Sequence, residues 1–104
     1  MRQIKKKSDK STTPDIISVW EFGESENITP IKWMLDNGCM YKTYTKKSHE
    51  LSCYNIDNDD GHQELFEGYS LLILGVNSDE NGSIKTVDCV VADNNWINEN
   101  YEEV

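Results

Sequence analysis

The chain has 104 residues, of which 37% are hydrophobic, and a formal net charge of −9 at pH 7. These totals exclude a large hydrophobic core and a general affinity for anionic nucleic acids or membranes. The charge is uneven, because residues 1–14 carry five basic groups against one acid, whereas residues 48–104 carry one basic group against thirteen acids. No segment approaches the roughly 18 apolar residues of a membrane span, and no apolar secretory signal precedes the body. We therefore expect a cytoplasmic protein.

Residues 1–14 are expected to form a flexible basic tail, followed by a single α+β domain over residues 15–104. The tail contains Lys5, Lys6 and Lys7 and almost no apolar residue that could anchor it. It could contact phosphate, remain a solvated arm, or fold back onto the acidic body.

The expected fold is a single small antiparallel sheet of about five strands, with a short helix after the first strand and a helix at the C-terminus. Residues 15–22 form the first strand, in which Trp20 and Phe22 occupy the face better suited to burial. Thr29 is expected to cap the short helix, which residues 37–38 end.

Alternating apolar and polar residues predict two further strands over residues 39–46 and 50–56, joined by a hairpin turn. A short strand at residues 62–67 leads to the central strand, Tyr69–Val76, which is the run apolar enough for burial on both faces. Asn81-Gly82 predicts a tight turn into the last strand at residues 83–91. Residues 92–104 are then expected to form the C-terminal helix.

The segment Asp57–Gly61 contains the residue types of a calcium loop but not their register. Counted back from the glycine, the first ligand position of such a loop falls on Ile56, so a turn between strands explains the segment better. The three cysteines are widely and irregularly spaced, which predicts reduced thiols rather than disulfides or a zinc site. We expect neither a metal nor another cofactor.

The chain is expected to contain an early tryptophan strand, a short helix and a hairpin, then a glycine-aromatic strand that leads through a turn to another strand, and a closing acidic-aromatic helix. The residues that carry this order are Trp20, Ile31–Leu35, Leu51–Ile56, Gly61, Gly68, Tyr69, Leu72–Val76 and Asn100–Val104. In this order the chain resembles small uncharacterised proteins encoded by phages and prophages of low-GC Gram-positive bacteria. It would be a divergent member, because their Pro-Gly-Asp before the central strand is replaced by Glu-Gly-Tyr and their later Tyr-Pro pair is absent. That group has no settled activity, so the resemblance implies no functional residue.

A binding protein is the leading hypothesis, and no catalytic motif supports an enzyme. The resemblance and the acidity together predict an inhibitor of a host defence or nucleic-acid enzyme, acting in the host cytoplasm as a nucleic-acid mimic in an anti-CRISPR or similar anti-defence role. Its partner would be a protein with a basic nucleic-acid-binding surface, and neither nucleic acid nor a membrane would be contacted directly. The carboxylates expected to bind this partner are Asp57, Asp59, Asp60, Glu64, Glu67, Asp79, Glu80, Asp88, Asp93, Glu99, Glu102 and Glu103.

Two alternatives stay open. The first is a homo-oligomer that sequesters a nucleotide-like signalling molecule, with aromatic rings stacked on a base and lysines against phosphate. Its ligand-binding residues would be Trp33, Tyr41, Lys42, Tyr44, Lys46, Lys47 and Tyr54. The second is a structural or regulatory phage protein without enzymatic activity.

Overall fold

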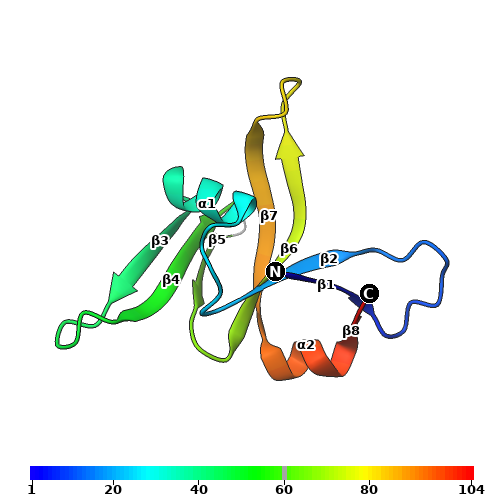
Figure 1. Cartoon of the computed structure of the whole chain (residues 1–104), viewed down its shortest axis with the longest axis horizontal. Helices are drawn as coiled ribbons and strands as arrows, with labels where there is room; N and C mark the ends of the chain where they lie inside the picture. Colours follow the sequence, from blue (N-terminus) through cyan, green and yellow to red (C-terminus); the bar gives the residue numbers. More distant parts are fainter. Residues whose placement is uncertain (60) are drawn as a thin grey trace.

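The computed structural model describes residues 1–59 and 61–104, and within them the chain is α+β with two antiparallel sheets and two short helices (Figure 1). The elements in chain order are β1 (Arg2–Lys6), β2 (Ile17–Glu21), α1 (Thr29–Asp36), β3 (Met40–Tyr44), β4 (Leu51–Asn58), β5 (Gly61–Leu65), β6 (Tyr69–Ser78), β7 (Ile84–Asp93), α2 (Asn94–Asn100) and β8 (Tyr101–Glu103).

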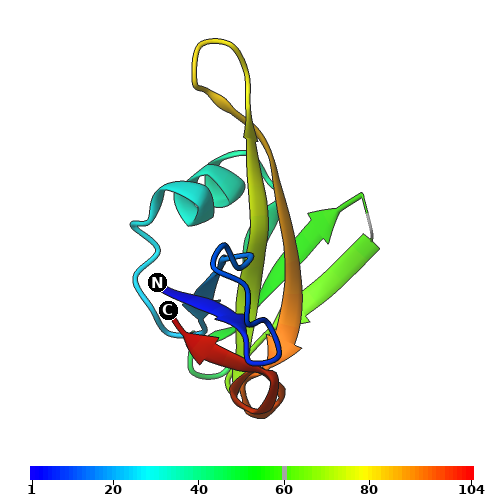
Figure 2. The same ribbon diagram turned by 90° about the vertical axis from the view of Figure 1, so that its right-hand side faces the viewer.

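The strands form a five-stranded sheet in the order β7-β6-β2-β1-β8 and a three-stranded sheet in the order β3-β4-β5. The expected class, α+β with antiparallel strands, is confirmed, whereas the expectation of a single sheet is wrong. The smaller sheet packs its apolar face against the larger one instead of extending it (Figure 2). Two side-chain hydrogen bonds also join the sheets, because Asn58 Nδ2 donates to the carbonyl of Cys89 and Gln63 Oε1 accepts from the backbone N–H of Val91.

Strand β6 lies inside the larger sheet only in its first half, and the expected burial of Tyr69–Val76 on both faces is wrong for Leu74 and Val76, which are 54% and 43% exposed. Its residues 70–73 are buried because the sheet is covered on both faces. On one face Trp20 and Leu71 are paired and pack with α1 and the smaller sheet. On the other face Val19 and Leu72 are paired and pack with Ile97 of α2. Strand β2 is therefore buried on both faces, whereas its sequence indicated burial mainly on the tryptophan face.

The expectation of a flexible tail over residues 1–14 is wrong for Arg2–Lys6, which forms strand β1 between β2 and β8. A single apolar residue anchors this strand, because the side chain of Ile4 is 1% exposed. The lysines also lie against the acidic C-terminus: Lys5 Nζ is 3.8 Å from Glu102 Oε1, and Lys7 Nζ donates to the carbonyl of Asn98. The sequence left three roles open for this segment, and in the structure the segment folds back onto the acidic body.

Both helices differ in detail from the expected ones. Helix α1 has Ile28 rather than Thr29 in the N-cap position, with no side-chain cap, and Thr29 is its first residue. The proline in its first turn and the end at Asn37 agree with the sequence. Helix α2 is capped by the carboxylate of Asp93, one of the two residues, with Asn94, that its sequence offers as a cap. It ends at Asn100, and the next three residues form β8, so the expectation of a helix is wrong for them. The chain extends there because β1 offers a free strand edge for pairing.

Glu26 connects the loop before α1 to the smaller sheet. Tyr54 Oη donates to Glu26 Oε2 at 2.5 Å and Lys42 Nζ donates to Oε1 at 3.0 Å. Both hydrogen bonds lower the pKa of Glu26, and the bond from Tyr54 has the larger effect. Burial, followed by the bond to Glu26, raises the pKa of Tyr54.

Replacing Glu26 with glutamine is expected to destabilise the fold at pH 7 more than at pH 3. Because the folded state lowers the pKa of Glu26, the stabilisation is complete above the unfolded pKa of about 4.3 and is lost as the pH falls through the folded value. Glu26 and Lys42 are about one-third exposed, so solvent screening limits the effect to about 1 kcal/mol. Urea unfolding at both pH values measures it, with Glu80→Gln as the exposed control. A difference from the wild type that is equally large at pH 3 would contradict this role of the carboxylate.

Candidate functional site

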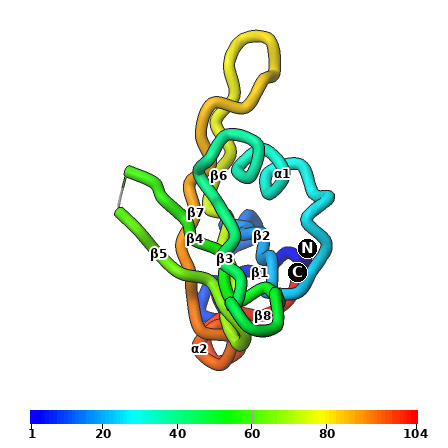
Figure 3. Tube along the Cα trace, turned by 90° about the vertical axis from the view of Figure 1, so that its left-hand side faces the viewer, coloured from blue at the N-terminus to red at the C-terminus, as the bar shows by residue number. Residues whose placement is uncertain are grey.

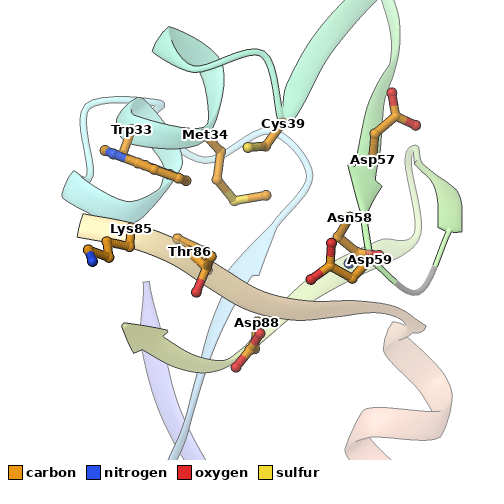
Figure 4. Close-up of a pocket in the computed structure, with 10 residues that line it drawn as sticks. Trp33, Met34, Cys39, Asp57, Asn58, Asp59, Lys85, Thr86 and Asp88 are labelled. Atoms are coloured by element: carbon orange, nitrogen blue, oxygen red, sulfur yellow. The ribbon is translucent and has the colours of Figure 1, made fainter. Parts of the chain in front are cut away.

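A pocket of about 170 Å³ lies between α1, the end of β4 and strand β7 (Figure 4). Its apolar wall comes from Trp33 and Met34 of α1, Cys39 just before β3, and Val87 of β7. A backbone hydrogen bond from the N–H of Asp57 to the carbonyl of Cys39 joins β4 to the residue before β3 at the edge of this pocket.

Polar residues occupy the two ends of the pocket. Lys85 lies beside the partly buried ring of Trp33, whereas Asn58 and Asp59 lie at the other end (Figure 4). The carboxylate of Asp88 accepts a hydrogen bond of 3.3 Å from Asn77 Nδ2 and points away from the wall formed by Trp33 and Met34 (Figure 4). An apolar body could therefore contact the indole while a cationic group approaches Asp59.

The outer face of the smaller sheet carries a second polar group next to this pocket. His62 Nδ1 is 2.6 Å from Asp57 Oδ1, and His62 Nε2 is 4.0 Å from Glu64 Oε1. The ring of Tyr41 lies 6.5 Å from the imidazole, and desolvation together with nearby Asp57 raises the pKa of the phenol. Asp57 thus borders both the pocket and this outer face.

The predicted partner-binding carboxylates do not gather on one surface. Asp57, Asp59 and Asp88 border the pocket, and Glu64 lies close by on β5. We name these four residues the acidic group. Asp60, which the sequence also assigned to this surface, lies outside the described residues.

The other predicted carboxylates are distributed over the rest of the molecule. Asp79 accepts from backbone N–H groups in the β6–β7 loop, next to Glu80, and Asp93 caps α2 at the opposite end of the molecule (Figure 1). Glu102 and Glu103 are paired with basic residues of β1. The remaining two are Glu67, in the turn after β5, and Glu99, on α2.

The residues of the alternative ligand site are also separated. Tyr54 is 2% exposed and packs edge-on against Trp20, so its ring is not available to stack on a base. Lys42 is paired with Glu26, and Lys46 and Lys47 lie in the β3–β4 turn. The other members are Trp33 in the pocket, Tyr41 on the outer face, and Tyr44 at the exposed end of β3.

Sequence reasoning missed several residues of the pocket, namely Met34, Cys39, Asn58, Lys85, Thr86 and Val87. No sequence motif contains these residues together, because they come from three separate segments that meet only in the folded chain. In the described part of the chain no group of three or more histidine, cysteine, aspartate or glutamate residues could hold a metal ion. None of the helices described is long and apolar enough to cross a membrane.

Comparison with known proteins adds no assignment: no family model, no curated protein and no solved structure matches this chain.

Proposed function

We propose that this chain is a phage-type binding protein that occupies a basic, nucleic-acid-binding surface of a host defence or nucleic-acid enzyme and thereby inhibits it. The observation that carries the proposal is the acidic group beside the pocket. Carboxylates there adjoin an apolar cavity, which suits the lysine and arginine side chains that such surfaces present to phosphate.

The distribution of ion pairs supports this choice of surface. The basic residues of β1 lie close to the C-terminal acids, since Arg2 Nη1 is 3.4 Å from Glu103 Oε1 and Lys5 pairs with Glu102. Within the acidic group, Asp57 and Glu64 lie within 4.0 Å of His62, whereas Asp59 and Asp88 have no ion-pair partner among the described residues. A basic partner can therefore neutralise these carboxylates without breaking an existing ion pair.

The pocket adds a specific contact to this general attraction. An arginine or lysine of the partner can place its aliphatic stem against Trp33 and Met34 and its charge near Asp59 (Figure 4). Burial of the stem would give an affinity that net charge alone does not provide. The nucleotide-sequestering alternative is less well supported, because Tyr54 is in the core and Lys42 is paired with Glu26.

A charge-matched pair of variants tests the proposal. The site variant is Asp59→Asn, Glu64→Gln, Asp88→Asn, and the control variant is Glu67→Gln, Glu80→Gln, Glu99→Gln. Each loses three negative charges, so the two differ only in where the charges are removed. Binding to purified host nucleases and nucleic-acid-binding proteins is measured by biolayer interferometry between 50 and 500 mM salt, in the presence and absence of duplex DNA.

The site variant is expected to bind the partner about tenfold more weakly or worse, whereas the control variant changes the affinity by less than about threefold. Duplex DNA should compete with the wild type, and higher salt should weaken binding because it screens the charges. Equal losses in the two variants, or binding that DNA does not displace, would overturn the proposal.

A further inference from the structure

Half of strand β6 extends beyond its neighbour β2. Strand β6 pairs with β2 only over Ser70–Ile73, whereas it pairs with β7 as far as Ser78. The register against β7 shifts between Ile73 and Gly75, where Leu74 is an extra residue, so the pairing with β2 ends where the bulge begins. The hairpin beyond this point projects from the rest of the molecule (Figures 1 and 3).

The projecting segment, Leu74–Ser78, therefore has one free strand edge. Within the described residues no strand pairs with it on the side away from β7. Such an edge presents a row of backbone N–H and C=O groups that can pair with another strand. A two-stranded hairpin is also marginally stable alone in water, so a third strand would stabilise it.

The composition of this edge lacks the features that usually prevent strands from pairing. Leu74–Ser78 contains no charged residue and no proline, and Leu74 and Val76 are 54% and 43% exposed. The outer edge of β7 differs, because it carries Lys85 and its backbone is partly covered by Asn58 and Gln63. Of the two outer edges of this hairpin, the edge of β6 is therefore the one available to pair with another strand.

We propose that Leu74–Ser78 is a dimerisation edge, which pairs antiparallel with the same segment of a second copy of this chain. A two-fold axis at Val76 would place Leu74 opposite Ser78 of the second copy, and an antiparallel pair of identical strands satisfies that symmetry. The pairing joins the two larger sheets into one continuous sheet. Two chains of net −9 repel each other, so a second copy must pair through a segment that carries no charge of its own. Leu74–Ser78 is such a segment, and in this register no like charges lie directly opposite each other in the two paired strands.

This dimer and the binding of a basic partner respond to salt in opposite ways. Higher ionic strength screens the repulsion between two acidic chains, so the dimer is expected to tighten between 50 and 500 mM salt. Sedimentation velocity over a range of protein concentrations measures the monomer–dimer equilibrium. Hydrogen exchange of the wild-type chain, read at the backbone N–H groups of Leu74–Ser78, should slow as the concentration rises.

Val76→Lys is the decisive variant, because it places two lysines opposite each other at the symmetry axis. It should raise the dimer Kd on the order of tenfold or more, even though it lowers the net negative charge of each chain. Asn81→Lys makes the same charge change in the loop of the same hairpin and should leave the Kd within about threefold. Circular dichroism of both variants checks that the fold is retained.

Three outcomes would overturn the proposal. The first is a wild type that stays monomeric up to millimolar concentration in 500 mM salt. The second is a dimer that Val76→Lys does not weaken. The third is protection of the Leu74–Ser78 amides only when a different protein is added, which would assign the edge to that protein instead of a second copy.

Discussion

Replacing Trp20 with alanine is expected to cost about 3–5 kcal/mol of unfolding free energy. The side chain is completely buried, and its ring lies 5.1 Å from that of Tyr54 in an edge-to-face arrangement. Its Nε1–H donates to the carbonyl of Ser25 at 2.9 Å. Because a domain of this kind has about 5–15 kcal/mol of stability in total, a large fraction of the variant should be unfolded at 37 °C.

Trp96 provides the matched control, because its side chain is 47% exposed on α2. Trp96→Ala should cost about 1 kcal/mol or less. Urea unfolding followed by far-ultraviolet circular dichroism compares the two without relying on tryptophan fluorescence. Equal losses at the two positions would contradict the placement of Trp20 between the two sheets.

Local patterns in the sequence predicted most of the strands and turns. The apolar run from Tyr69 predicted β6, and alternation predicted β3 and β4 with a turn that the structure completes at His49, whose φ is 55°. The sequence likewise indicated where the two helices begin, because the proline of α1 and the carboxylate cap of α2 each act on the first turn of their own helix. These features depend on residues close together in the chain.

The arrangement of the strands depends on contacts that no local pattern encodes. Strand β8 is extended because β1, about a hundred residues earlier, offers an edge at Lys5 and Lys6. Two sheets form instead of one because Met40 and Ile56 of the smaller sheet pack against the same core as Leu71. Alternation gives the face that a strand buries but not the element that covers it.

The candidate site could be predicted only in part for the same reason. The acidic content of residues 48–104 indicated a basic partner, and Asp57, Asp59 and Asp88 do border one pocket. A count of charges could not reveal that Glu102 is paired with Lys5 or that Glu103 is paired with Arg2. Both facts follow from the folded chain, and both remove carboxylates from the proposed interface.

Replacing Ile4 with alanine is expected to cost about 2–5 kcal/mol, although residues 1–14 have the composition of a flexible tail. The side chain is 1% exposed and packs in the second core, with residues of β2, β6, α2 and β8. Ile16→Ala is the matched control, since that isoleucine is 42% exposed, and it should change stability by about 0.5 kcal/mol. Urea unfolding measures both.

Deletion of residues 1–7 extends the same test from a side chain to the whole strand. Without β1, strand β8 has no neighbour in the sheet and the second core loses one wall, so the truncated chain should lose cooperative unfolding or melt far below the full chain. A mobile tail could be removed without any change in the melting temperature. The segment would be the flexible tail that its composition suggests if the deletion left the melting temperature unchanged and Ile4→Ala and Ile16→Ala had equal effects. A large loss in both experiments would show that one buried isoleucine and the backbone pairing of β1 are enough to order a strongly basic segment against an acidic body.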